Sequence, residues 1–355
     1  MSALTQKPVV LRDYEDVRVR RGRRSGLTVA VAVHRTVNGR SLGGCRMKPY
    51  ASPDDAVRDV ERLARAMSFK AAVAGLQLGG AKGVIALDPT ESLTDELRRD
   101  ALHDFAELVE SFEGRYITAQ DVGISAEDIA FMEQFTDHVA GRPAAEGGCG
   151  DPSPYTAHGV EVAIRASLGS RTISGAHIVI IGLGHVGGAL AQRLRNAGAK
   201  LTLSDVDQGK RELAQQLWAE WAEPGEAMKI TADLLAPCAL GGILTPESVA
   251  ELRVPVIAGA ANNQLSDESV ADLLSDRGIV WAPDFVVNAA GLIAVADELH
   301  GFDPERAERS IAGIGHTLRQ IYARAAAGKN TLLAAKELAA ERSGIELEES
   351  DGDHV

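Results

Sequence analysis

A single lysine, Lys82, lies between glycines in the run LQLGGAKGVIALDP at residues 76–89. Apolar neighbours exclude water from its ammonium group, and desolvation lowers the pKa of a lysine. Enzymes use lysines of this kind as an acid or a base near neutral pH. The run lacks the Gly-x-x-x-x-Gly-Lys-Ser/Thr order of a phosphate-binding loop. The stretch therefore predicts either a reactive lysine or a tight turn in a buried strand whose lysine reaches solvent.

The second chemical signal is the glycine-rich segment GLGHVG at residues 182–187. It follows the β-branched run HIVII and precedes apolar residues at helical spacing over 188–194. A strand, a glycine turn and a helix in this order form a dinucleotide-binding fingerprint, because glycines permit a tight turn and close approach of a pyrophosphate. The alternative is a structural unit of the same kind that has lost its ligand. We predict dinucleotide binding by the whole segment, namely by Gly182, Leu183, Gly184, His185, Val186 and Gly187.

The choice of dinucleotide depends on Asp205, which ends the apolar run that begins at residue 200. A carboxylate at the tip of the second strand binds the hydroxyls of an adenosine ribose and repels the 2′-phosphate of NADP. The sequence therefore predicts NAD as the cofactor. Lys210 and Arg211 lie close by in the sequence and leave NADP as the alternative.

The composition is typical of a globular enzyme, with 355 residues, 45% hydrophobic and 25% charged, which is long enough for two domains. The net charge of −13 argues against nucleic acid as a partner. Cys45, Cys149 and Cys238 are too far apart to predict a metal site or a disulfide framework, so we expect no metal and a reducing, cytoplasmic compartment. The chain has no apolar run of membrane-spanning length and no signal-peptide core, so no membrane partner is expected.

The elements that must position these residues follow from hydrophobic periodicity. In the first half we expect strands within 9–49, helices at 52–74 and 93–112, and a short strand at 116–119. The Gly- and Pro-rich stretch 144–154 predicts a hinge, and alternating strands and helices from there to about residue 300 predict a doubly wound sheet. Residues 306–342 are expected to be helical with a break at Gly328, and the acidic tail 346–355 to be disordered.

Several motifs follow one another along the chain: LGGCRM (42–47), MSFK (67–70), LQLGGAKGVIALDP, TAQDVG (118–123), DPSPYTAHGV (151–160), GAANNQL (259–265) and NAAGLI (288–293). In these motifs and their order the chain resembles the glutamate/leucine/phenylalanine/valine dehydrogenases. The resemblance implies an α/β fold with two domains. An N-terminal α/β substrate domain over 1–148 would be followed, across a cleft, by a C-terminal Rossmann-type doubly wound NAD-binding domain over 149–305. C-terminal helices at about 306–345 would pack back on the first domain.

The resemblance also implies roles for single residues. Lys82 would be the catalytic lysine, and Asp121 would take part in proton transfer, because an amine must be neutral before it is oxidised. Lys70 would bind the substrate α-carboxylate, and Gly44 would offer a backbone contact. Residues that contact the substrate or the nicotinamide would come from the second domain: Asn263 or Asn262, and Thr156 with Ser153 behind it. Without the resemblance, Asp121 also suits a turn cap and the two asparagines suit turn residues.

The residue before the paired glycines distinguishes substrates within the family. Glutamate-specific relatives carry a lysine there, but this chain has Leu42, so no cation would pair with a second substrate carboxylate, whose burial is costly. Ala81 and Ala290 stand where branched-chain members more often have glycine, which bears on side-chain specificity rather than on the reaction. The resemblance implies an apolar pocket lined by Leu42, Ala119, Leu292 and Val295.

We therefore expect a homo-oligomeric enzyme that carries out reversible, NAD-dependent oxidative deamination of leucine, valine or isoleucine, small molecules with an apolar side chain. Phenylalanine dehydrogenase activity is the first alternative, although phenylalanine-type relatives tend to have glycine at the position of Ala119. A catalytically silent NAD-binding regulatory protein is the alternative from another class. The presence of Lys70, Lys82 and Asp121 together argues against that second alternative.

Overall fold

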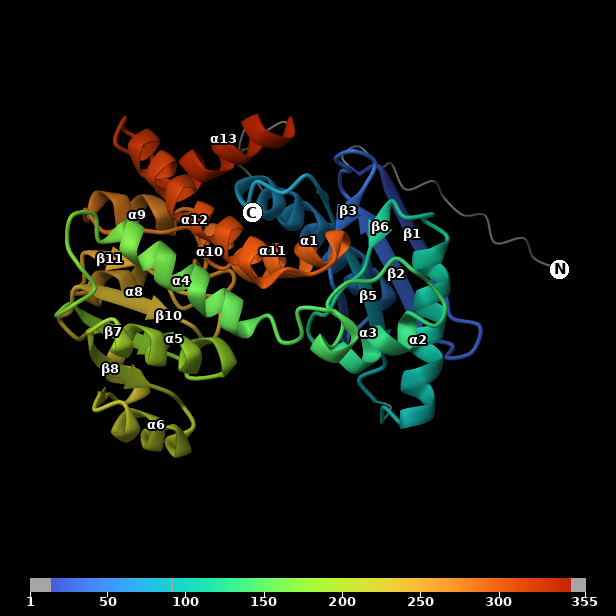
Figure 1. Cartoon of the computed structure of the whole chain (residues 1–355), viewed down its shortest axis with the longest axis horizontal. Coiled ribbons are helices and arrows are strands. Elements are labelled where there is room, and N and C mark those ends of the chain that lie inside the picture. The colour runs from blue at the N-terminus through green and yellow to red at the C-terminus, as the bar shows by residue number, and fades with distance from the viewer. Residues whose placement is uncertain (1–13, 91, 346–355) are drawn as a thin grey trace. The chain divides into compact units, whose positions relative to one another are not determined.

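The chain divides into two compact units in the computed structural model, which describes residues 14–90 and 92–345 (Figure 1). Within the described residues, one unit comprises 14–68, 77–90 and 92–142, and the other comprises 69–76 and 143–345. The division along the chain therefore falls at Pro143 rather than after residue 148, and the second unit takes a short segment from the N-terminal half. The predicted strand residues 9–13 and the acidic tail 346–355 lie outside the described residues.

The first unit is built on a six-stranded mixed sheet of order β1-β2-β5-β3-β6, with β4 paired to β5 as well. Its strands are β1 Asp16–Arg21, β2 Thr28–Val33, β3 Ser41–Leu42, β4 Cys45–Pro49, β5 Gly79–Leu87 and β6 Tyr116–Ile117. The β1–β2 and β2–β5 pairs are antiparallel, whereas β3 and β4 run parallel to β5 and β6 runs parallel to β3. The parallel strands therefore bring the residues that follow β3 and β6 to one edge of the sheet.

Helices cover both faces of this sheet, because successive residues of a strand point to opposite faces. Ala30 and Ala32 of β2 pack in one cluster with apolar residues of α1 (Pro53–Val73), and Val29 and Val31 pack in another with residues of α2 (Asp95–Glu110). The short helix α3 (Ala126–Met132) joins the α2 side. The expected strands and helices of this region are therefore confirmed, with boundaries that differ by one or two residues for α1 and α2.

The second unit contains a sheet of order β12-β11-β10-β7-β8-β9 in which every strand pair is parallel. Its strands are β7 His177–Ile181, β8 Lys200–Ser204, β9 Glu220–Trp221, β10 Leu234–Pro237, β11 Val256–Ile257 and β12 Val280–Trp281. The chain winds outward from β7 to β9 and then returns to β10 beside β7, which confirms the doubly wound sheet. In such sheets ligands bind beyond the carboxyl ends of the strands where the order reverses, here β7 and β10.

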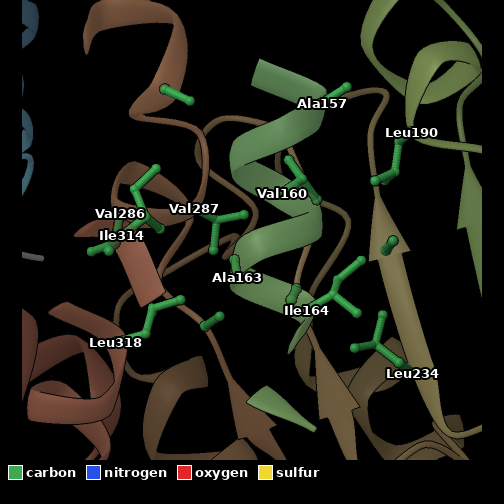
Figure 2. Packing of buried hydrophobic residues seen from close by; sticks show 14 of the residues in the cluster. Ala157, Val160, Ala163, Ile164, Leu190, Leu234, Val286, Val287, Ile314 and Leu318 are labelled. Carbon is green, nitrogen blue, oxygen red and sulfur yellow. The ribbon is translucent and has the colours of Figure 1, made fainter. Parts of the chain in front are cut away.

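Helices surround the sheet of this unit, and the apolar face of α4 lies in the hydrophobic core of the unit. They are α4 Ser153–Ser167, α5 His185–Asn196, α6 Arg211–Gln216, α7 Pro224–Ala227, α8 Pro246–Glu251, α9 Val270–Asp276, α10 Asp284–Val287, α11 Ala290–Asp297, α12 Pro304–Ala325 and α13 Thr331–Ser343, with 3-10 turns η1 Ala144–Glu146, η2 Gln208–Lys210 and η3 Glu298–His300. Figure 2 shows Val160 and Ile164 of α4 among apolar side chains from the neighbouring elements, including Leu234 of β10 and Leu318 of α12. The buried face of α4 fixes the start of this helix, where Ser153 and Thr156 lie.

The C-terminal helices α12 and α13 are separated near Gly328, whose φ of +98° suits glycine and confirms the expected break. They belong to the second unit and contact the segment it takes from the N-terminal half. The hydroxyl of Thr317 and a guanidinium nitrogen of Arg342 donate to the carbonyl oxygen of Val73 at 3.2 and 2.8 Å. Among the described residues no helix is long and apolar enough to cross a membrane.

Candidate functional site

Lys82 lies in the middle of β5, and its side chain is only 5% exposed. Glycines next to it allow close packing of the surrounding elements. A Cβ at Gly80 would lie 2.0 Å from the backbone nitrogen of Ser68 on α1, and one at Gly83 would lie 2.3 Å from the ring of Phe105 on α2. These glycines therefore let the two helices approach the strand, and the interpretation of Lys82 as a lysine that reaches solvent is wrong.

The Lys82 ammonium faces a carboxylate from another strand end. Its Nζ lies 2.8 Å from Oδ1 of Asp121, which follows β6. The backbone carbonyl of Asp121 accepts the N–H of Ile124 at 3.0 Å, so the turn is closed by backbone groups. The carboxylate contacts cations instead, which argues against the interpretation of Asp121 as a turn cap. The pair of a buried amine and a carboxylate is the arrangement expected of an acid–base centre.

A second cation, Arg46, completes the surroundings of Asp121 and was not singled out from the sequence. Its Nε donates to Oδ2 of Asp121 at 2.9 Å, and its NH1 group reaches Asp59 of α1 at 3.3 Å. Asp59 also accepts the hydroxyl of Tyr50 at 2.7 Å. Lys82, Asp121, Arg46 and Asp59 therefore form a row of alternating charges. Strand alternation places residue 46 on the same face as Gly44, and this spacing in LGGCRM is the signal that could have identified Arg46.

The row of charges controls the ionisation of its two carboxyls. Burial opposes ionisation of Asp121, but the attraction of Lys82 and then Arg46 holds its pKa below the ordinary value. Burial likewise opposes ionisation of Asp59, while hydrogen bonds from Tyr50 and Arg62 and the nearby cations lower its pKa to about 2. Both carboxyls are therefore ionised at neutral pH.

Neutral groups lie close to this pair. Burial, followed by the charge of Asp121, raises the pKa of the Cys45 thiol well above its ordinary value, so the thiol stays protonated. The buried hydroxyl of Tyr116 donates to the carbonyl of Gly43 at 2.8 Å and lies 3.0 Å from the hydroxyl of Thr118. These groups are proton donors without charge, and they leave Asp121 as the anion that faces Lys82.

Three further predicted residues lie at the strand ends of the same unit. A Cβ on Gly44 would lie 2.3 Å from the carbonyl oxygen of Gln120 and 2.9 Å from Cβ of Asp121, so only glycine allows this approach. Leu42 ends β3 and is 1% exposed, and Ala119, just beyond β6, is 5% exposed. Both side chains are apolar and buried, as a pocket floor requires.

In the second unit the glycine turn joins β7 to α5. Gly182 has a φ of +96°, and a Cβ there would lie 2.5 Å from Cβ of Ala239, just beyond β10. A Cβ on Gly187 would lie 1.9 Å from the carbonyl oxygen of Gly182. Gly184 is different, because a Cβ there would meet nothing within 4 Å. The first N–H groups of a helix lack intrahelical partners, so those of His185 and Val186 suit an anionic ligand.

Asp205 follows β8 and lies beside this turn. Its Oδ2 accepts the backbone N–H of Leu183 at 2.6 Å, and its Oδ1 accepts that of Asp207 at 2.9 Å. Each carboxylate oxygen has a further lone pair, so these bonds leave Asp205 able to accept ribose hydroxyls. Leu183 contributes its backbone, because its side chain is buried. The turn and the carboxylate are thus held together by main-chain groups. The crowded glycines fit a tight turn and close helix packing, and the open space at Gly184 fits the close approach that a pyrophosphate needs.

The two predicted asparagines lie on a loop that buried residues hold. Asn262 and Asn263 are exposed, and Asn263 has a φ of +51°. The side-chain amide of Asn288 donates to Oδ1 of Asn262 at 2.8 Å and to the carbonyl of Ala260 at 3.1 Å. Buried Gln264 donates to the carbonyls of Gly259 and Ala261 at 2.9 and 3.1 Å. The loop is therefore fixed from inside while its two asparagines remain accessible.

Asp284 supports the same loop and connects it electrostatically to Lys70. Its Oδ2 accepts the N–H of Gln264 at 2.8 Å. Burial raises the pKa of Asp284, and the N–H groups of the loop together with the charge of Lys70 oppose that rise. Lys70 is half-buried in the last turn of α1. Asp284, Gln264 and Asn288 were not identified from the sequence, because nothing in their spacing distinguishes them from ordinary core residues.

The remaining predicted residues lie on α4 and α11. The hydroxyl of Thr156 donates to the carbonyl of Pro152 at 3.1 Å, and a Cβ on Gly291 would lie 2.7 Å from that hydroxyl. Ser153 begins α4, and its N–H is held by Asp151 at 2.9 Å. Leu292 and Val295 lie on α11, half-buried and buried respectively. Within residues 14–90 and 92–345 no group of three or more His, Cys, Asp or Glu side chains could hold a metal ion.

Comparisons with known proteins match both halves of the chain to one family. Residues 12–138 match the model for the Glu/Leu/Phe/Val dehydrogenase dimerisation domain, and residues 202–301 match the model for glutamate/leucine/phenylalanine/valine dehydrogenase. Leucine dehydrogenase of Thermoactinomyces intermedius is 40% identical over 93% of this chain and 91% of that protein.

This chain is also similar to proteins that are named as dehydrogenases of aromatic amino acids. Phenylalanine dehydrogenase of Lysinibacillus sphaericus is 38% identical over 85% of this chain and 81% of that protein. The crystal structure of L-tryptophan dehydrogenase from Nostoc punctiforme matches with a TM-score of 0.82 and 35% identity over 94% of this chain and 96% of that chain. Chains with three different amino acids in their names are thus similar to this one over most of its length.

Proposed function

The chain belongs to the glutamate/leucine/phenylalanine/valine dehydrogenase family, and from that premise we propose that it oxidises leucine, valine and isoleucine with NAD. Family membership makes the protein an amino acid dehydrogenase, an oxidoreductase that acts on a CH–NH2 group. The products are the 2-oxo acid and ammonia, and the reaction is reversible.

The observation that carries the proposal is the buried ion pair between Lys82 and Asp121, 2.8 Å apart. Oxidation requires a neutral amine, so a proton must leave the substrate ammonium, and Asp121 is the anion available to receive it. Water must then add to the iminium carbon and lose a proton, and Lys82 would accept that proton in its neutral form, after its own ammonium proton has left the site. Lys70 would hold the substrate α-carboxylate, and the backbone at Gly44 would contact the substrate.

The hydride acceptor is proposed to be NAD, which supplies the redox chemistry when bound. The N–H groups at the start of α5 would hold its pyrophosphate, Asp205 would accept the adenosine ribose hydroxyls, and Thr156 with Ser153 would hold the nicotinamide carboxamide. Asn262 would contact the nicotinamide and Asn263 the substrate. Asp205 favours NAD over NADP because a carboxylate repels a 2′-phosphate. Half-buried Lys210, which ends η2, and exposed Arg211, which begins α6, remain the residues that would bind that phosphate in the alternative.

An apolar substrate is supported by Leu42 and Ala119, both buried and uncharged. A substrate carboxylate buried against them would have no cation partner, which is costly. Leu292 and Val295 would add aliphatic surface to the substrate pocket. Phenylalanine is the second candidate, since a phenylalanine dehydrogenase is 38% identical, but the methyl group of Ala119 takes space that a ring needs. We also propose that the enzyme is a homo-oligomer, consistent with the dimerisation-domain match, and that it works in the cytoplasm.

The experiment that tests this function is NADH formation by the purified protein with leucine, valine, isoleucine, phenylalanine, tryptophan and glutamate. The expected order places the branched-chain amino acids first and glutamate last. NADP in place of NAD tests the cofactor, and NADH consumption with the 2-oxo acid and ammonia tests reversibility. NAD binding by calorimetry without turnover of any amino acid would favour a silent regulatory protein and contradict the proposal.

A further inference from the structure

Arg46 contacts the proposed proton acceptor directly, although it does not reach Lys82. Its Nε binds Oδ2 of Asp121 at 2.9 Å, while Lys82 binds Oδ1 at 2.8 Å. Each carboxylate oxygen of Asp121 thus has its own cation. A carboxylate held at both oxygens cannot rotate without breaking a charge-assisted hydrogen bond, and such bonds are the strong ones.

Arg46 is itself held from the other side. Its NH1 group lies 3.3 Å from Asp59, and its side chain is 18% exposed. Asp59 in turn accepts Tyr50 at 2.7 Å and Arg62 at 2.8 Å and lies 3.5 Å from the Lys48 ammonium. Asp59 therefore keeps other partners when Arg46 is removed, whereas Asp121 would keep Lys82 as the partner of one oxygen.

We infer that Arg46 is a positioning residue for the proposed proton acceptor: it holds Oδ2 of Asp121 so that Oδ1 faces Lys82. The inference rests on the proposed function for the roles of Lys82 and Asp121. Arg46 acts through Asp121 and is assigned no contact with substrate or cofactor. Its guanidinium presents a planar set of donors that can bind two carboxylates at once, which a lysine ammonium does not reproduce.

The direction of the pH effect follows from the charges that face Asp121. Lys82 and Arg46 favour its ionised form, and burial opposes it. Loss of Arg46 removes one favourable charge, so the carboxyl group protonates at a higher pH. The acid limb of kcat/KM should then move to higher pH. The other groups that interact with Asp121 do not oppose this change. Cys45 on β4, Tyr116 on β6 and Tyr50 are neutral. Asp59, which is linked to Asp121 through Arg46, remains in place in the variant.

The test is the variant Arg46→Met, with Lys48→Met as a matched control on the same strand. Lys48 lies beside Asp59, at the end of the row of charges away from Asp121. Its loss should therefore leave kcat and the acid limb of the kcat/KM profile unchanged. Arg46→Met should lower kcat for leucine by roughly tenfold or more, a coupling expected of residues in direct contact, with KM for NAD unchanged. Arg46→Lys should restore part of the loss. A folded Arg46→Met protein with the parent kcat and acid limb overturns the inference.

A double-mutant cycle separates positioning from general structural support. If Arg46 acts through Asp121, Arg46→Met should cost far less when Asp121→Asn is already present. Equal losses in both backgrounds would mean that Arg46 supports the fold and not the acceptor, which contradicts the inference.

A direct titration keeps the inference testable if the protein oxidises none of the amino acids tried. Carbon-13 NMR of aspartate carboxyls follows Asp121, assigned by its absence in Asp121→Asn. Its pKa should rise in Arg46→Met and stay unchanged in Lys48→Met. An unchanged titration in Arg46→Met overturns the role of Arg46, whereas absent turnover with the expected titration overturns only the proposed function.

Discussion

Lys82 and Gly182 both lie in glycine-rich segments, but different forces hold the two centres. In the first unit, side-chain charges fix the centre: Lys82 pairs with Asp121, and Arg46 holds the second oxygen of that carboxylate. In the second unit, main-chain groups fix the centre: Gly182 has a positive φ, and the N–H of Leu183 binds a carboxylate.

This difference predicts how each centre responds to substitution. Around Lys82 the backbone is a regular strand, so removal of the ammonium changes the chemistry more than the fold. At the glycine turn there is no side chain to remove, and the sensitive change is the addition of a Cβ. Substitutions that remove charge should therefore affect turnover in the first unit, and substitutions that add volume should affect cofactor binding in the second.

The largest expected effect is that of Lys82→Ala. Alanine suits β5, and Asp121 keeps Arg46 as a partner, so the fold and NAD binding should persist while kcat falls about 10²–10⁴-fold, the usual contribution of a general acid or base. Steady-state NADH formation and calorimetric NAD binding measure the two quantities, and partial rescue by added amines is expected. Retention of activity within about tenfold, or about 1.4 kcal/mol of barrier, would show that Lys82 is not the catalytic group.

The next effect tests the main-chain centre with two glycines of one turn. Gly182→Ala forces a residue with a Cβ into a left-handed conformation and against Ala239, which should destabilise the fold by about 2–4 kcal/mol. Gly184→Ala should leave the melting temperature unchanged, since its Cβ meets nothing within 4 Å. It should still weaken NAD binding, because the added methyl group lies where the pyrophosphate is expected. Equal melting temperatures for both variants would mean that the turn is not constrained by its backbone.

The sequence predicted the main-chain centre more completely than the charged one. A strand, a glycine turn, a helix and Asp205 are all local signals, and each lies where it was expected. The ion pair of Lys82 with Asp121 joins β5 to the end of β6, so only the family resemblance placed the two residues in one site. Arg46 was missed because an arginine in a strand is usually a surface residue, and its partners come from elements distant in the sequence.

The differences in the fold have similar causes. The strand expected at 116–119 is shorter, β6 Tyr116–Ile117, because Thr118 pairs with Val139 in an isolated bridge instead. The hinge expected to extend to residue 154 ends earlier because Ser153 and Pro154 begin α4, where a proline is tolerated in the first turn. The segment 69–76 joins the second unit through contacts with α12 and α13, which no local pattern reports.

The third prediction concerns the apolar residues beside the charged centre. Ala119→Gly should shift kcat/KM toward phenylalanine by about 1–3 kcal/mol, the value of roughly one methyl group of space. Leu42→Lys should weaken leucine oxidation and favour glutamate, because only an acid can pair with the introduced charge. Kinetic constants for leucine, valine, isoleucine, phenylalanine and glutamate on the three proteins measure this. Glutamate as the best substrate of the parent enzyme would contradict the pocket assignment, and phenylalanine as the best would mean that Ala119 does not limit the pocket.

The fourth prediction returns to the main-chain centre. Asp205→Ser removes the charge that repels a 2′-phosphate, so the preference for NAD over NADP should narrow by about tenfold. The N–H of Leu183 also loses a charged acceptor, and a modest fall in NAD affinity should accompany the change. The ratio of kcat/KM for the two cofactors measures the effect. Equal efficiency of the parent enzyme with both cofactors would overturn the assignment and point to Lys210 or Arg211 as phosphate ligands.

The smallest expected effect is on acid stability and concerns Asp59, at the far end of the charged row. Its pKa of about 2 in the folded protein lies below the reference value of 3.8, so its ionised form stabilises the fold above pH 3.8 and this contribution disappears as the pH falls through about 2. Asp59→Asn should therefore lower the free energy of unfolding by on the order of 1 kcal/mol at neutral pH and by progressively less toward pH 2. Denaturant unfolding across this range measures the difference, and Asp54→Asn, an exposed residue of the same helix, should follow the parent protein throughout. A deficit for Asp59→Asn that stays constant down to pH 2 would mean that packing, rather than the charge of Asp59, sustains this end of the row.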